Sequence, residues 1–260
     1  MEIWQAIVLG AVQGFTEFLP VSSSGHLLLL QNWFGITENT VFYTVMLHIG
    51  TLIPVIAVLY KEIAGLFRDK WRRFFLLVLA TVPAGIFGIV FEKFVGIEEL
   101  FADHIWLLSI TFALTAAELI FAEIRAKKTA LDKEIGFKTA LAMGCGQAVG
   151  VLPGISRSGS TLTAGTLIKV KPEENAAFTF LMSIPIILAA AFLSSLKIVK
   201  SGSIGDVNAL SLVFGVITAA VTGYIAVRFM LKVIKKANYK WFSVYLACLS
   251  AVNLIVYFAK

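Results

Sequence analysis

The residues best suited to chemistry lie in two serine- and glycine-rich segments that are far apart in the chain. The first runs Pro20-Val21-Ser22-Ser23-Ser24-Gly25-His26, and the second runs Pro153-Gly154-Ile155-Ser156-Arg157-Ser158-Gly159. Hydroxyl groups and a guanidinium bind phosphate oxygens, whereas an imidazole or a carboxylate exchanges protons. Together these residue types suit phosphoryl transfer or the transport of a phosphate ester.

Glu17 stands three residues before Pro20, inside an apolar stretch. A charged side chain at the centre of a membrane costs roughly 2.5–3.5 kcal/mol, so a cation, a proton or water must offset that cost. One interpretation is a structural ion pair with Arg157. The other, which we favour, is acid–base or metal chemistry at Glu17, with Gln13 one helical turn earlier on the same face.

Three kinds of side chain are expected to work with Glu17. Arg157 suits forked contact with phosphate, and His26 suits a general base or acid near neutral pH. The hydroxyl groups cap helices or bind phosphate oxygens, and one of them is a nucleophile if a base reaches it. The expected substrate-binding residues are Gln13, Ser22, Ser24, Ser156, Ser158, Gly159, Ser160 and Thr161, with Ser23 beside them. His48 and Glu118 are interpreted as hydrogen-bonded residues of membrane spans.

Composition indicates the setting in which these residues act. The chain has 260 residues, of which 58% are hydrophobic and only 15% charged, against roughly 25% charged residues in soluble domains. A spanning helix needs about 20 mostly apolar residues. Six stretches meet that need, at about 40–60, 74–92, 104–124, 174–197, 208–231 and 241–259.

Two further apolar regions, 1–38 and 137–170, are broken in the middle by the serine-rich segments. Proline and glycine prevent a straight helix there. We therefore expect two re-entrant helical hairpins, each with two half-helices that meet at membrane depth. A loop at that depth is tolerated only where protein or water surrounds it.

Loop charge orients this arrangement. The net charge is +6, and basic residues gather in 61–73, 125–138 and 232–240, whereas 92–103 is acidic. This pattern is a topology signal and argues against nucleic-acid binding. It places the basic loops in the cytoplasm and both termini on the outer face.

The fold class expected is an all-α polytopic membrane protein with an inverted-topology repeat, residues 1–124 and 137–260, in one membrane domain. Gln13 lies nine residues before Ser22, and Gln147 lies nine before Ser156. Because the hairpins enter from opposite faces, their tips meet near the midplane. Two half-helix N-termini then face one cavity, which favours an anion.

At these residues the sequence resembles the undecaprenyl-diphosphate phosphatase family, also called bacitracin-resistance proteins. The matching stretches are Gln13-Gly14-Phe15-Thr16-Glu17-Phe18-Leu19-Pro20-Val21-Ser22-Ser23-Ser24-Gly25-His26 and Pro153-Gly154-Ile155-Ser156-Arg157-Ser158-Gly159-Ser160-Thr161. The first carries the family's Glu/Gln-x-x-x-Glu pattern and the second its Pro-Gly-x-Ser-Arg-Ser-Gly-x-Thr pattern.

The resemblance implies hydrolysis of undecaprenyl diphosphate to undecaprenyl phosphate and inorganic phosphate in the bacterial cell membrane. That reaction recycles the lipid carrier for cell-wall polymers and opposes bacitracin, which sequesters the diphosphate. It also implies a divalent cation, Mg²⁺ or Ca²⁺, at Glu17, catalytic roles for Glu17, Ser23, His26 and Arg157, an active site open to the outer face, and a homodimer. Gln13 fills the first acidic position with a neutral amide, which leaves one carboxylate in the motif.

Two other functions fit the same residues. Inverted repeats with broken helices are also transporter anatomy, so the chain could flip a lipid phosphate. A non-catalytic scaffold is the second alternative, but it explains the intramembrane charges poorly. Attack by Ser23 and direct attack by water are both open as mechanisms.

Overall fold

The structure is a computed structural model of the chain, and it describes residues 1–36, 40–68, 71–201 and 208–259. Within these ranges the chain forms the helices α1 to α12, with one isolated β-bridge between Lys133 and Val170. Lys70 and Lys260, which contribute to the loop-charge argument, lie outside the described residues.

Six helices are long and apolar enough to cross a membrane, which confirms the six predicted spans and an all-α polytopic membrane protein. They are α3 (Thr40–Val58), α5 (Trp71–Val95), α7 (Leu107–Lys128), α10 (Pro172–Ser201), α11 (Ala209–Lys235) and α12 (Lys240–Phe258). Two short helices that the sequence did not indicate, α4 (Tyr60–Arg68) and α6 (Ile97–Asp103), follow α3 and α5.

Both serine-rich segments break the chain into half-helices where the sequence predicted. The pieces are α1 (Ile3–Phe18), α2 (Ser23–Trp33), α8 (Phe137–Val149) and α9 (Arg157–Leu167). Leu19 is extended (φ −69°, ψ 144°) because it precedes Pro20, and this ends α1. Gly154 adopts φ +84°, a turn conformation that favours glycine.

Glycines allow the half-helices to pack closely on membrane spans. A Cβ added at Gly10 of α1 would lie 2.3 Å from the carbonyl oxygen of Gly215 in α11. A Cβ added at Gly144 of α8 would lie 2.5 Å from the carbonyl oxygen of Ala80 in α5. Since Gly10 and Gly144 each stand three residues before a glutamine, the two contacts correspond in the two predicted repeats.

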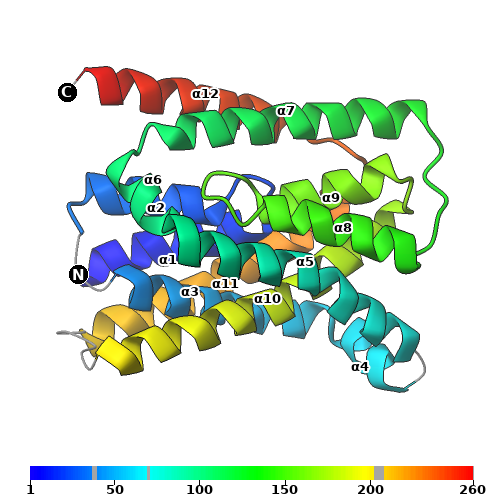
Figure 1. Cartoon of the computed structure of the whole chain (residues 1–260), viewed down its shortest axis with the longest axis horizontal. Helices are drawn as coiled ribbons and strands as arrows, with labels where there is room; N and C mark the ends of the chain where they lie inside the picture. Colours follow the sequence, from blue (N-terminus) through cyan, green and yellow to red (C-terminus); the bar gives the residue numbers. More distant parts are fainter. Residues whose placement is uncertain (37–39, 69–70, 202–207, 260) are drawn as a thin grey trace.

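Figure 1 shows how this packing arranges the molecule. The N-terminus and the end of α12 lie at one end, and α4 and the connection between α7 and α8 lie at the other. The α1/α2 loop and the α8/α9 loop lie between these ends. Two broken helices therefore bring their breaks to the interior of a bundle of spans; that both hairpins are re-entrant stays a prediction.

Candidate active site

The two interrupted segments contact each other directly. Ser158 Oγ donates to the carbonyl oxygen of Leu19 at 3.1 Å. A Cβ added at Gly25 would lie 2.8 Å from the Cα of Gly154, and one added at Gly159 would lie 3.3 Å from the Cβ of Pro20. The absence of side chains at the two helical glycines lets the starts of α2 and α9 approach one another.

A serine caps the N-terminus of each second half-helix. Ser22 Oγ accepts the backbone N–H of Gly25 at 3.4 Å, and Ser156 Oγ accepts that of Gly159 at 3.1 Å. Each cap also contacts the next-but-one serine through its hydroxyl, Ser24 at 3.4 Å and Ser158 at 3.2 Å. Two helix N-termini with hydroxyl groups around them form an environment that favours an anion.

Glu17 is the centre of the site, and it is buried. Ser23 Oγ donates to its Oε2 at 2.6 Å, and Gln13 Nε2 donates to the same oxygen at 3.0 Å. The Arg157 guanidinium pairs with its Oε1. The cation and the two donors compensate the burial of this carboxylate.

His48 of α3 is the residue that sequence reasoning missed. Its Nδ1–H donates to the carbonyl oxygen of Thr44 at 2.7 Å, and its Nε2 lies 3.4 Å from Oε2 of Glu17. The sequence interpretation, a hydrogen-bonded span residue, covers only the first contact. The available signal was a second ionisable side chain in a span that follows Glu17, because such residues tend to face one another in membranes.

His26 lies at the start of α2 but turns toward α12. Its Nδ1–H donates to the carbonyl oxygen of Ser22, and Tyr245 donates its hydroxyl to Nε2, each at 2.7 Å. The imidazole also stacks on the Tyr245 ring, with centroids 5.6 Å apart. Both nitrogens are thereby occupied, so the structure brings Glu17, Ser23 and Arg157 together and holds His26 beside them on other partners.

The remaining predicted hydroxyls in α9 bond away from Arg157's guanidinium. Thr161 Oγ1 donates to the backbone carbonyl of Arg157 at 2.8 Å. Ser160 Oγ donates to Oε1 of Glu118 in α7, also at 2.8 Å. These bonds fix the first turn of α9, and Glu118 is the partner that ties this turn to α7.

The site offers two kinds of oxygen to a metal ion, the carboxylate of Glu17 and the amide of Gln13. Oε1 of Gln13 is buried and has no hydrogen-bond partner among the described residues, and it stands beside the Glu17 carboxylate. The described residues contain no group of three histidine, cysteine or acidic side chains that could hold a metal ion. One carboxylate and one amide oxygen fit Mg²⁺, which often takes most of its ligands from phosphates and water.

Fold and site together define a class: a polytopic α-helical membrane protein with a buried cluster in which a carboxylate contacts a hydroxyl and an arginine. Comparison with known proteins makes the class specific. Residues 6–252 match the family described as "Bacitracin resistance protein BacA". The chain belongs to this family.

Relatives match over nearly their full length. One named undecaprenyl-diphosphatase, from Carboxydothermus hydrogenoformans, is 37% identical over 258 residues, which cover 98% of each chain. Another of the same name, from Caldicellulosiruptor bescii, is 39% identical over 269 residues, which cover 100% of this chain and 99% of the relative. Similarity at this level and coverage extends to both interrupted segments and all six spans.

Proposed function

We propose that this protein is an undecaprenyl-diphosphate phosphatase, which converts undecaprenyl diphosphate and water to undecaprenyl phosphate and inorganic phosphate. The observation that carries the proposal is the Ser23 hydroxyl bonded to one oxygen of Glu17 while Arg157 pairs with the other. The proposed nucleophile, Ser23, and the proposed phosphate-binding cation, Arg157, thus both contact the proposed base, Glu17. The product returns the lipid carrier to cell-wall synthesis, and this turnover opposes bacitracin.

The first step is recognition of the diphosphate. The helices α2 and α9 begin at Ser23 and Arg157, and the side chains of both residues contact Glu17. Phosphate oxygens accept from the N–H groups of helix N-termini and from a guanidinium, which also neutralise the charge that spreads over them during transfer. Ser24, Ser156 and Ser158 supply further hydroxyls around the anion.

Ser23 acts as the nucleophile in this mechanism. Its Oγ attacks the terminal phosphorus, the bond from that phosphorus to the bridging oxygen breaks, and undecaprenyl phosphate leaves. Oε2 of Glu17 takes the hydroxyl proton, because it already accepts the Ser23 hydroxyl at 2.6 Å. Water then cleaves the phosphoserine, and inorganic phosphate departs. His26 is the less favourable base, since both its nitrogens have other partners.

The same residues offer a place for a divalent cation. Glu17 and the unpartnered Oε1 of Gln13 would hold it together with diphosphate oxygens. An ion held there would offset the negative charge of the phosphates and of the departing undecaprenyl phosphate. Without the ion, Arg157 and the helix N-termini carry the anion binding alone.

The orientation that we propose puts both termini and the site opening on the outer face of a bacterial cell membrane. It is supported by the basic loops, which gather in 61–73, 125–138 and 232–240 and are expected in the cytoplasm. A homodimer is the assembly that we propose from the family resemblance. Neither feature is needed for the chemistry at Glu17.

The test is release of inorganic phosphate by the purified protein in detergent, with and without EDTA. We expect release from undecaprenyl diphosphate, loss of release on chelation, and loss in Arg157→Ala, which removes the phosphate-binding cation. A flippase has no activity without a bilayer, so absence of release in detergent, with lipid transport in vesicles, would reject the phosphatase.

Trapping separates the two routes of attack. A phosphoserine at Ser23, found by mass spectrometry after rapid quench, supports the covalent route. Full turnover in Ser23→Ala would show that water attacks directly.

A further inference from the structure

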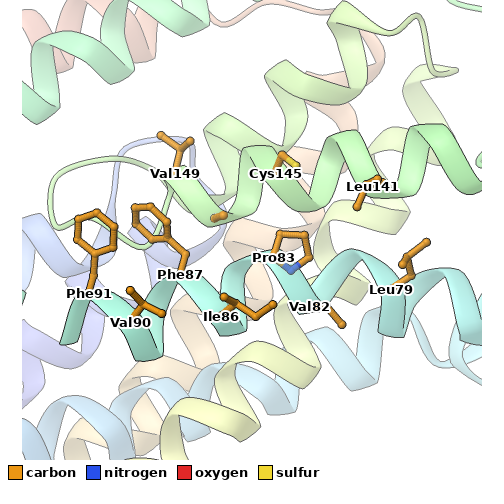
Figure 2. Close-up of a pocket in the computed structure, with 11 residues that line it drawn as sticks. Leu79, Val82, Pro83, Ile86, Phe87, Val90, Phe91, Leu141, Cys145 and Val149 are labelled. Atoms are coloured by element: carbon orange, nitrogen blue, oxygen red, sulfur yellow. The ribbon is translucent and has the colours of Figure 1, made fainter. Parts of the chain in front are cut away.

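An apolar groove lies between α5 and α8, with a cavity volume of about 590 Å³. We call it the α5/α8 groove; it is lined by residues between Leu79 and Phe91 of α5 and between Leu141 and Val149 of α8. Figure 2 shows Phe87, Pro83 and Cys145 among the side chains that line it. All of its lining side chains are aliphatic, aromatic, proline or cysteine, so the groove suits a hydrocarbon rather than a polar ligand.

One end of the groove adjoins the α8/α9 loop, which leads into Arg157 at the start of α9. The lining residue Val149 is followed by Gly150, where an added Cβ would lie 2.4 Å from the Cα of Arg157. On the α5 side, a Cβ added at Gly88 would lie 3.7 Å from a methyl of Val151 in the same loop. The groove therefore begins at the α8/α9 loop and follows α5 for about 18 Å, at 1.5 Å per residue.

The corresponding helix pair, α1 with α11, is packed closely at the matching position. In α1, a Cβ added at Gly14 would lie 2.4 Å from the carbonyl oxygen of Ala219 in α11. Alignment of Gln13 with Gln147 places Ala148 at the position of Gly14, and the Ala148 methyl lines the groove. At this one position, therefore, α8 carries a methyl group that lines the groove, whereas α1 carries a glycine that packs against α11.

We infer that the α5/α8 groove binds the isoprenoid segment next to the diphosphate of a polyprenyl diphosphate. This inference rests on the proposed function, because the tail is covalently attached to the anion that Arg157 binds. The tail needs an apolar path away from a polar site, and the groove is an apolar path that starts at the α8/α9 loop. Burial of hydrocarbon in a preformed groove gives affinity that a headgroup alone does not supply.

The two cysteines of the chain provide an internal comparison. Cys145 lines the groove, whereas Cys248 lies on α12, and both are exposed free thiols. Purified protein in detergent is labelled with N-ethylmaleimide, with undecaprenyl phosphate absent or present, and each site is followed by mass spectrometry. With the lipid at about ten times its Kd, labelling of Cys145 slows about tenfold while that of Cys248 is unchanged.

Equal labelling of Cys145 with and without the lipid would overturn the inference. So would protection that needs no added lipid and rises with protein concentration, because a second copy would then cover the groove. Protection by detergent or by a phospholipid of the same concentration would show a general lipid surface and would overturn it as well.

Turnover gives an independent measurement. Cys145→Trp fills the groove, and we expect about a tenfold higher KM for undecaprenyl diphosphate with little change in kcat, as loss of uniform binding predicts. Cys248→Trp is the matched control and keeps both constants. If the unmodified protein releases no phosphate, the proposed function fails; if it does and Cys145→Trp behaves like the control, only the groove assignment fails.

Discussion

The two interrupted segments are built alike but contribute different chemistry. Ser23 is the first residue of α2 and Arg157 the first residue of α9, and each follows a serine cap. Both reach Glu17, Ser23 at one carboxylate oxygen and Arg157 at the other. Glu17 itself has no counterpart, since alignment of the two glutamines places Val151 there. Two helix starts of similar build thus carry unlike residues, and in the function that we propose one supplies the nucleophile and the other the group that binds the anion.

Among the substitutions that test this difference, one at Glu17 should have the largest effect on kcat. Glu17→Gln keeps the shape and one hydrogen bond but removes the base for Ser23 and the charge opposite Arg157. We expect kcat to fall about 10³-fold, within the range for loss of a general base. Phosphate release under saturating substrate measures this.

A second intramembrane carboxylate gives the control. Glu118 of α7 accepts the hydroxyl of Ser160, and among the described residues it forms no hydrogen bond or ion pair with Ser23 or Arg157. Glu118→Gln retains an acceptor for that hydroxyl, so kcat should stay within about threefold, the effect of one modest hydrogen bond. Equal losses in both variants would mean that buried charge, rather than the base at Ser23, limits the rate.

Much of this arrangement could be predicted from the sequence, and the limits of prediction are physical. A membrane span is defined by the average hydropathy of about 20 residues and not by any single side chain, so the six spans could be predicted. Proline alone was a weaker guide, because Pro54, Pro83 and Pro185 lie inside α3, α5 and α10. The combination of proline, glycine and serine located the two breaks.

Side-chain direction could not be predicted in the same way. His48 and Tyr245 reach Glu17 and His26 only because α3 and α12 have particular rotations in the bundle. Such rotation follows from long-range packing, and Tyr245 is 219 residues from its partner. The sequence indicated that Glu17 and Arg157 belong to one site, but not which spans complete it.

His48 increases the difference between the two halves of the chain. With Gln13 and Ser23, it is the third side chain from the first half that contacts Glu17. His48→Ala should lower kcat about tenfold by letting the Glu17 carboxylate leave its aligned position. His48→Gln offers an amide N–H to the Glu17 carboxylate and should recover part of this loss. His104→Ala, at a residue whose Nδ1 bonds the carbonyl oxygen of Leu100 near the end of α6, is the control and should be silent. An unchanged kcat in His48→Ala would show that His48 has no role at the site.

The smallest effect concerns the two caps, whose backbones differ. Ser22 has φ +71°, whereas Ser156 has φ −80°, and the cap bond of Ser22 is longer, at 3.4 Å against 3.1 Å. Four residues connect α1 to α2 and seven connect α8 to α9, so the shorter loop forces a left-handed residue at its end. A non-glycine residue in such a region costs about 1–3 kcal/mol.

Glycine should therefore have opposite consequences at the two positions. Ser22→Gly removes the strain, which offsets the lost cap and the added freedom of the unfolded chain, so thermal stability in detergent stays level or rises. Ser156→Gly has no strain to remove and should lower the free energy of unfolding by about 1 kcal/mol. Equal destabilisation by the two substitutions would show that the two caps contribute alike and that Ser22 stores no strain. If Ser156→Gly lowers stability and Ser22→Gly does not, the shorter loop stores strain at Ser22, directly before Ser23.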